Sequence, residues 1–234
     1  MARLAALGAV VAVTAVLAAA ATAAHSPKAL RHSMFTAARA QRSVHYVSHS
    51  AIQGNTIVVG DVGRTRGIQH ITYATGGKTG HATIVVANKT AYVHGDAFTL
   101  HGFIGFPRKQ ASRYANVWVK VPQQSHLYAS VADAVTLPSF LAEIYPKTNL
   151  KRQTRSVHGI PLVGVQGSTR HHGIPFLEAV FVRTGGKPLP VVEIEVAPSA
   201  DFKAVTAMGR WNEPLHIGIP RHAVVYVGSG GTTA

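Results

Sequence analysis

The chain of 234 residues contains no cysteine. Disulfide bonds, thiol chemistry and a lipid anchor on a cysteine are therefore excluded, and packing must stabilise the fold. Acidic residues are scarce as well, since 9 Asp and Glu stand against 23 Lys and Arg, for a formal net charge of +14. This balance predicts a basic surface that suits an anionic membrane surface or wall polymer.

The basic residues are spread along the chain and form no dense block. Modest groups occur at Arg64 and Arg66, at residues 108–113 and at residues 147–155. Nucleic-acid-binding arms carry compact runs of Lys and Arg, so we expect no nucleic-acid partner.

Long apolar runs are absent except at the N-terminus. Arg3 supplies a positive charge, residues 4–20 carry none, and small residues follow. This is the layout of a signal peptide, and the run is slightly shorter than the roughly 20 apolar residues of a membrane-spanning helix. We expect residues 1–24 to be a signal peptide cleaved after Ala23 or Ala24, with an uncleaved anchor as the alternative. The protein is then exported to the periplasmic or cell-wall space, or secreted.

Residues 25–228 are expected to form a single domain, followed by a flexible tail at residues 229–234. A short helix is predicted at Ser33–Gln41, with Ser33 as its N-cap. From Ser43 the apolar residues alternate with polar ones, which predicts strands separated by hairpin turns. The expected antiparallel meander has strands from residue 43 and at residues 56–62, 67–74, 81–87 and 90–94.

The middle of the chain has a different pattern. Pro107 can open a short helix through Tyr114, and apolar residues at three- and four-residue spacing predict two further helices at residues 125–134 and 137–145. A strand is expected at residues 117–122. A second β-rich half then runs over residues 154–196, and a last strand lies near residues 223–227.

Catalytic signatures are missing from the sequence. The Gly-x-Ser-x-Gly elbow of hydrolases does not occur. Glu193 and Glu195 would share one face of a single strand about 7 Å apart, so they cannot oppose each other across a cleft. We expect them on the outward face of an edge or solvated strand. The sequence predicts a protein that is not an enzyme and needs no cofactor.

The sequence has 14 histidines, which is an unusual count. A metal site needs three or four ligands that converge on one point. His45 and His49 lie on a predicted strand, where a spacing of four residues separates them by about 13 Å. We therefore expect no metal site.

Several segments resemble the LppX and LprG type of cell-envelope lipoproteins, which are relatives of the LolA carriers. The resemblance rests on residues 90–95, 116–122, 137–144, 187–191 and 211–215. It implies an α+β, mainly β fold, in which a few helices cover the concave face of a curved antiparallel sheet, or half-barrel, around an apolar cavity for acyl chains. The chain departs from this family because it lacks the lipobox cysteine.

This resemblance predicts which residues would bind a ligand. The apolar residues expected to line the cavity are Tyr92, Phe98, Trp118, Leu127, Val131, Leu137, Phe140, Leu141 and Ile144. For any one of them, a filled core is the alternative interpretation. Basic residues at the cavity mouth, Arg108, Lys109 and Arg113, are expected to contact an anionic head group.

The expected function is the extracytoplasmic binding or carriage of a lipid or another hydrophobic small molecule by a monomer. The alternative is an envelope protein that carries no lipid and binds anionic wall polymers or a protein partner through its basic surface.

Overall fold

The computed structural model describes residues 26–51, 54–171, 174–197, 199 and 201–227. The predicted signal peptide and the predicted tail lie outside these residues. Within the described part of the chain, no helix has the length and apolar character needed to cross a membrane.

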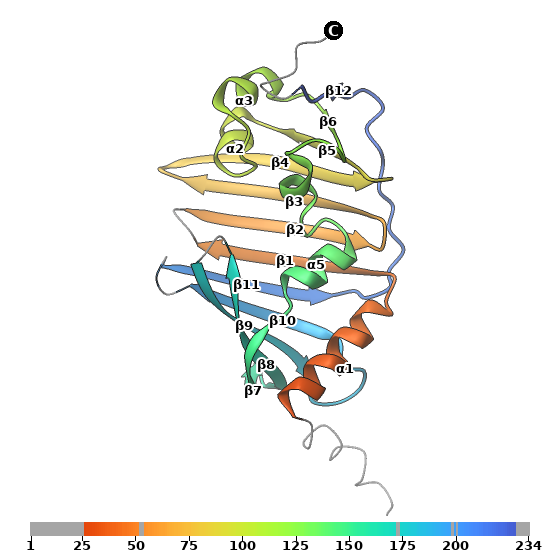
Figure 1. The fold of residues 1–234 in the computed structure, drawn as a ribbon, viewed down its shortest axis with the longest axis vertical. Coiled ribbons are helices and arrows are strands. Elements are labelled where there is room, and N and C mark those ends of the chain that lie inside the picture. The colour runs from red at the N-terminus through yellow and green to blue at the C-terminus, as the bar shows by residue number, and fades with distance from the viewer. Residues whose placement is uncertain (1–25, 52–53, 172–173, 198, 200, 228–234) are drawn as a thin grey trace, which may run out of the picture.

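A single sheet of twelve strands dominates the molecule (Figure 1). Neighbouring strands are antiparallel except at one edge, where β12 runs parallel to β6. The sheet is not closed, so the predicted half-barrel of α+β, mainly β class is confirmed. The strands are β1 (Ser43–Ala51), β2 (Asn55–Gly63), β3 (Arg66–Thr75), β4 (Lys78–Ala87), β5 (Thr90–Gly95), β6 (Val119–Pro122), β7 (Thr148–Val157), β8 (Ile160–His171), β9 (Ile174–Arg183), β10 (Pro190–Ala197), β11 (Phe202–Gly209) and β12 (Val224–Val225).

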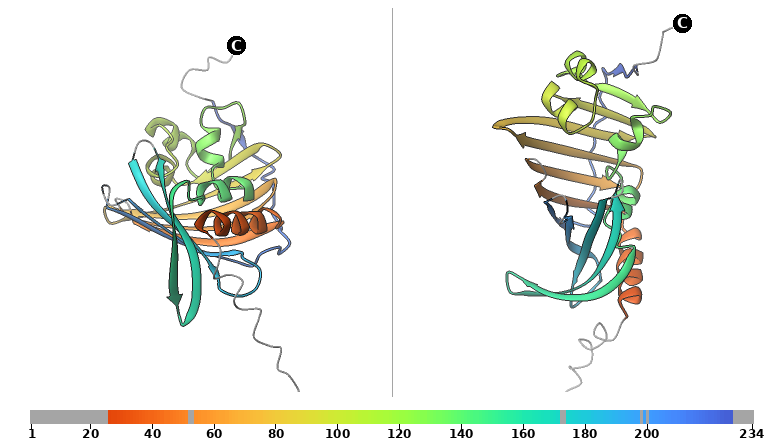
Figure 2. Two further views of the ribbon diagram at one scale, coloured as in Figure 1. Left: turned by 60° about the horizontal axis from the view of Figure 1, so that its bottom comes forward. Right: turned by 60° about the vertical axis from the view of Figure 1, so that its left-hand side comes forward.

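Two meanders make up this sheet. Strands β1 to β6 follow one another outward in one direction, and strands β11 to β7 follow one another outward in the other. The meanders join where β1 pairs with β11, from His45 opposite Gly209 to Ala51 opposite Lys203. The sheet is twisted, so the strand direction rotates from each strand to the next. Strands β7 and β8 therefore run at a steep angle to β2, β3 and β4 (Figure 2).

Strand β11 was not predicted from the sequence. Its inward side chains, Ala204, Thr206 and Met208, are buried but include a small and a polar residue. They do not form the run of large β-branched residues that marks a strand.

The connection between the meanders has to cross the sheet. Strand β6 lies next to one edge and β7 forms the other, so residues 123–147 pass from one side to the other over the concave face (Figure 1). Helices α4 (Tyr128–Ala132) and α5 (Leu137–Glu143) form along this path. A capping box between Thr136 and Ser139 fixes the start of α5.

The remaining helices cover the two ends of the sheet. Helix α1 (Pro27–Arg39) contacts α5, β7, β8 and β10. Helices α2 (Ala97–Gly102) and α3 (Arg108–Tyr114) lie in the connection from β5 to β6 at the opposite end (Figure 1). The helix expected through Tyr114 is confirmed, whereas α2 was not predicted.

The predicted start of the first helix was wrong. The helix begins at Pro27, and the Ser26 hydroxyl accepts a hydrogen bond from the Ala29 amide at 3.2 Å. Ser33 therefore lies inside the helix. A serine followed by proline is a strong start signal, because proline has no amide hydrogen and its φ angle already suits the first helical position.

The core has two clusters on the concave side. One packs α2, α3 and α4 against β3 to β6, around Ile84, Val93 and Phe106. The other packs α1 and α5 against β1, β2, β8 and β9, around Phe35 and Phe140. Strand alternation explains both clusters, because every second side chain of a strand points to the covered face.

The chain after β11 runs back along the ends of the strands to β12 (Figure 1). Asn212 ties it to the start of β1. The backbone N–H of Asn212 donates to the Ser43 carbonyl at 3.0 Å, and its side-chain oxygen accepts from the backbone N–H of Arg42 at 2.7 Å. The predicted last strand near residues 223–227 is present as β12.

Two glycines allow close contacts on the concave face. A Cβ atom on Gly67 would lie 1.8 Å from the Val135 carbonyl oxygen, and one on Gly60 would lie 2.2 Å from the Tyr46 ring. The segment between α4 and α5 therefore rests directly on the sheet at Gly67.

We predict that Gly67→Ala lowers the free energy of unfolding by at least about 1–3 kcal/mol, because the backbone of Val135 must move away from the added methyl group. Gly209→Ala is the matched control, since a Cβ there meets nothing within 4 Å. Urea denaturation of both variants measures the difference. Equal stability of the two variants would show that the segment does not depend on this contact.

Candidate functional site

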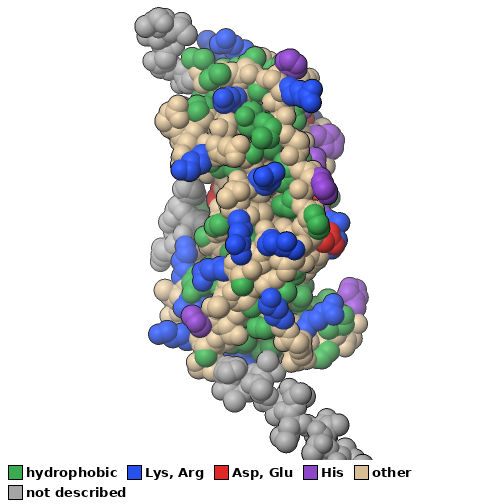
Figure 3. Space-filling view, turned by 90° about the vertical axis from the view of Figure 1, so that its right-hand side faces the viewer, with side chains coloured by type: hydrophobic (Ala, Val, Ile, Leu, Met, Phe, Trp, Pro, Cys, Tyr) green, Lys and Arg blue, Asp and Glu red, His purple; other side chains and the backbone are tan. Residues whose placement is uncertain are grey.

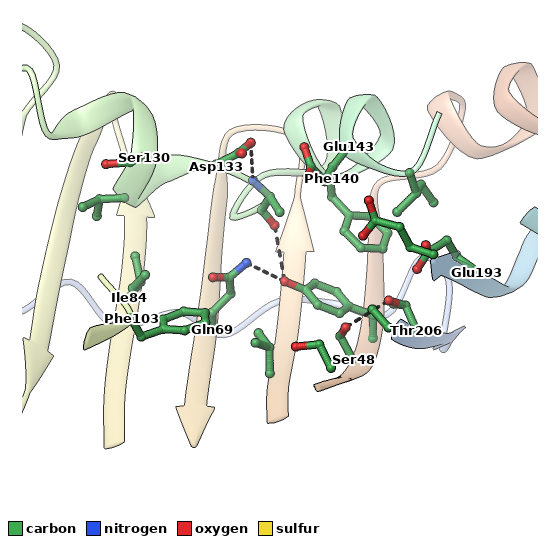
Figure 4. A pocket seen from close by; sticks show the side chains of 18 of the residues that line it. Ser48, Gln69, Ile84, Phe103, Ser130, Asp133, Phe140, Glu143, Glu193 and Thr206 are labelled. Carbon is green, nitrogen blue, oxygen red and sulfur yellow. Dashed lines mark hydrogen bonds between the residues drawn. The ribbon is translucent and has the colours of Figure 1, made fainter. Parts of the chain in front are cut away.

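A cavity of about 320 Å³ lies between the concave face of the sheet and the connection that carries α4 and α5. The sheet supplies residues from β1 to β4 and from β10 and β11, and the helix side supplies residues 103–104 and 130–144 (Figure 4). Its lining is mixed. The apolar part includes Val58, Ile84, Ile104, Val131, Phe140 and Ile144, and the polar part includes Ser48, Gln69, Ser130, Asp133, Glu143, Glu193, Glu195 and Thr206.

The floor of the cavity holds the buried hydroxyl group of Tyr46. The Tyr46 ring stacks on Phe140 with centroids 4.4 Å apart. Its hydroxyl is hydrogen-bonded to the Gln69 side-chain amide and lies 3.5 Å from the Ala134 carbonyl (Figure 4). Burial raises the pKa of Tyr46, so the hydroxyl stays protonated and ties the sheet to the segment between α4 and α5.

Carboxyl groups form one wall of the cavity. Glu193 and Glu195 follow each other on one face of β10, and both line the cavity. Glu178 of β9 stands directly opposite Glu195 in the sheet and therefore shares that face. Asp133 and Glu143 approach from the helix side (Figure 4).

These glutamates hold their protons unusually tightly. Burial, followed by the neighbouring carboxylates, raises the pKa of Glu178 to about 9. Burial raises the pKa of Glu193 to about 8, although a hydrogen bond with Thr206 opposes the change, and the pKa of Glu195 to about 7. Near neutral pH the wall is therefore largely protonated and becomes negative as the pH rises.

The prediction that Glu193 and Glu195 lie on a solvated outer face was wrong. Strand β10 is an interior strand between β9 and β11, and only 4% of Glu193 is exposed. The two residues do share one face, as predicted, but the helix layer covers that face.

The predicted apolar ligand residues fall into three groups. Val131, Phe140 and Ile144 line the cavity. Leu127, Leu137 and Leu141 are buried in the two core clusters and do not reach it.

The third group lies away from the cavity. Tyr92 alternates with the inward residues Ala91 and Val93, so it points to the opposite face of the sheet. The Trp118 ring lies 5.2 Å from the ring of His94, which alternates in the same way. Phe98 stacks on Tyr73 with centroids 5.2 Å apart, outside the cavity lining.

The predicted head-group residues lie on α3. Arg108, Lys109 and Arg113 are exposed, and none of them lines the cavity. The Arg113 guanidinium lies 5.5 Å from the centre of the Tyr114 ring. Contact of these residues with an anionic head group stays a prediction.

The acidic wall was not predicted from the sequence. A signal was available, because the chain has only 9 acidic residues and five of them, Asp133, Glu143, Glu178, Glu193 and Glu195, fall within residues 133–195. Their convergence depends on strand pairing, which the sequence does not display. No group of three or more His, Cys, Asp or Glu in the described residues is arranged to hold a metal ion.

No protein-family model and no curated protein matches the sequence. The solved structures that are similar to it at low identity include the following three. An uncharacterized conserved protein from Thermus thermophilus is 9% identical, with 86% of this chain and 99% of the other covered at a TM-score of 0.47. A DUF1329 family protein from Desulfovibrio piger is 9% identical, with 83% and 96% covered at a TM-score of 0.27.

The third is a protein from Bacteroides fragilis, described as exported and as having a YmcC-like fold. It is 10% identical, with 74% of this chain and 97% of the other covered at a TM-score of 0.21. At these TM-scores the likenesses support no conclusion about function.

We predict that the protein becomes less stable as the pH rises. The unfolded chain loses the protons of these glutamates near pH 4.5, whereas folded Glu178 keeps its proton to about pH 9. The folded state therefore binds more protons in this window, and the free energy of unfolding falls as the pH increases through it. Thermal unfolding between about pH 5 and about pH 9 measures the effect.

Glu178→Gln should flatten this dependence, because the amide cannot ionise. Between about pH 5 and about pH 9, the free energy of unfolding should fall by at least about 1.4 kcal/mol less in the variant than in wild type. This difference corresponds to one pKa unit. Glu213→Gln changes an exposed carboxylate outside the cavity and serves as the control. Parallel profiles for all three proteins would contradict a raised pKa at Glu178.

Proposed function

We propose that the protein is exported and binds a lipid-like, amphipathic molecule in the cavity under α4 and α5. The observation that carries the proposal is a cavity of about 320 Å³ with an apolar side at Val131, Phe140 and Ile144 and a polar side at β10 and β11. Ligand sites of proteins have volumes of about 300–1,000 Å³ and combine apolar walls with a few polar groups. The protein then acts as a monomer and a carrier without chemical turnover.

The helices over the cavity support reversible binding. Helix α4 has 5 residues and α5 has 7. Helices this short have little stability of their own and keep their shape through contacts with the sheet. A ligand that replaces those contacts can enter without unfolding the sheet.

Two features of the sequence support the wider setting. The predicted signal peptide implies export, and the absence of cysteine leaves the mature protein without the usual lipoprotein anchor. The resemblance to LppX and LprG implies an open half-barrel with helices over its concave face, which is the class of fold that the chain adopts. An exported, lipid-carrying relative of these lipoproteins, either released or held by an uncleaved signal peptide, accounts for these features.

The second candidate function is binding of an anionic wall polymer. Lys and Arg side chains are scattered over the face that carries the strand ends, and few acidic side chains are visible there (Figure 3). Such a surface attracts polyanions in a salt-dependent way. Salt-sensitive retention on a wall polymer by protein that contains no extractable lipid would favour this candidate.

We predict that protein purified from an exporting bacterial host contains lipid. Native mass spectrometry should show a monomer with bound mass, and organic extraction should identify the ligand class. A mass equal to that of the polypeptide, together with no uptake of fluorescent acyl probes, would refute the carrier proposal.

We also predict that Ser130→Trp weakens binding of a fluorescent acyl probe about tenfold, because a large side chain on α4 would occupy the space that Ser130 lines. Ala129→Trp adds the same side chain at the neighbouring exposed position, outside the lining, and should bind like wild type. Equal affinities for the two variants would place the probe elsewhere on the protein.

A further inference from the structure

The acidic wall of the cavity contrasts with the rest of this basic chain. Glu193 and Glu195 line the cavity, and Glu178 stands opposite Glu195 on the same face of the sheet. The charge of Glu143 acts on all three. Lys147 also acts on Glu178, but its effect is smaller than those of burial and the neighbouring glutamates.

Glu178 gives an independent indication of a ligand. It is only 1% exposed, and neither of its carboxyl oxygens has a hydrogen-bond partner among the described residues. Burying a carboxyl group without a partner costs stability, so buried acids are normally paired with Arg, Lys or hydrogen-bond donors. Glu178 does not line the cavity, but it stands next to Glu195, which does. A cation held at Glu193 and Glu195 would therefore lie close to this unpaired acid and offset the cost of burying it.

We propose that the ligand of this cavity is a cationic amphiphile whose ammonium group is bound by Glu193 and Glu195, with Glu178 directly behind Glu195. This inference rests on the proposed function and specifies the class of ligand. An ammonium group donates up to three hydrogen bonds, and charge-assisted bonds to carboxylates are about twice as strong as neutral ones. The aliphatic part of the ligand lies against Phe140 and Ile144, which adjoin the acidic wall in the cavity.

The geometry disfavours an anionic ligand. A phosphate or carboxylate placed at the wall would face the charge of Glu143 and, once Glu195 and Glu193 lose their protons at about pH 7 to about pH 8, like charges from β10 as well. Arg108, Lys109 and Arg113, the basic residues that would neutralise it, do not line the cavity. The hydroxyls of Thr206 and Ser48, 3.1 Å apart, add hydrogen-bond acceptors beside Glu193 and suit an ammonium donor.

Ligand binding and proton release are coupled at this wall. An alkylammonium ion keeps its charge up to about pH 10, whereas the glutamates lose their protons between about pH 7 and about pH 9. The groups that face them are Asp133 and Glu143 on the helix side, Lys147 after α5, and Tyr46 on β1. Affinity for an amine therefore rises from about pH 6 to about pH 8, with protons released to solvent.

The test compares decylamine, 1-decanol and decanoate, which share one chain length. Each probe is titrated below its micellar concentration into the purified protein by isothermal titration calorimetry at about pH 8, where Glu195 and part of Glu193 are ionised. We expect decylamine to bind at least about tenfold more tightly than 1-decanol, with decanoate weakest. Equal affinity for the amine and the alcohol would overturn the cationic ligand and leave the proposed function standing. If none of the three probes binds, the proposed function fails as well.

Variants locate the ammonium site. Glu193→Gln and Glu195→Gln, both in the cavity lining, should each lower the affinity for decylamine about tenfold and leave that for 1-decanol unchanged, so the alcohol reports whether the cavity is intact. Glu213→Gln, outside the cavity, should bind like wild type. If both cavity variants keep the full preference for the amine, the assignment of the acidic wall is refuted.

Discussion

The pairing of β1 with β11 is the interaction on which the cavity depends. It joins two meanders, each of which would otherwise end in an unpaired edge strand. Ser48, Thr206 and Glu193 lie side by side across β1, β11 and β10, and all three line the cavity. The floor from the N-terminal meander and the acidic wall from the C-terminal meander therefore meet at this pairing.

The strand order also explains why the cavity has a cover. A chain that leaves β6 near one edge and enters β7 at the other must cross the whole sheet. Gly67 lets this crossing segment touch the sheet at Val135, and the Tyr46 hydroxyl anchors it at Ala134. Between these contacts and the two core clusters, the short helices leave space that side chains do not fill.

The acidic residues that would bind a cation also lower the stability of the folded protein. Three glutamates share one covered face, and burial raises their pKa values to about 9, 8 and 7. Such a wall weakens the folded state at alkaline pH, when the carboxyl groups lose their protons. Apolar residues at Glu178 and Glu193 would avoid this cost, and the cost is part of the reason for proposing that the wall binds a cation.

The sequence by itself determined the class of the fold. The sequence pattern predicted the strands β2 to β5 from their alternation, α5 from its apolar spacing and α3 from Pro107. Each of these signals depends only on residues that are neighbours along the chain. Only the tertiary structure decided which faces are covered and what the cavity offers. Glu193 and Glu195 were predicted to share a face, but whether that face meets water or a helix layer depends on β11 and on the crossing segment, because burial follows from contacts between residues far apart in the chain.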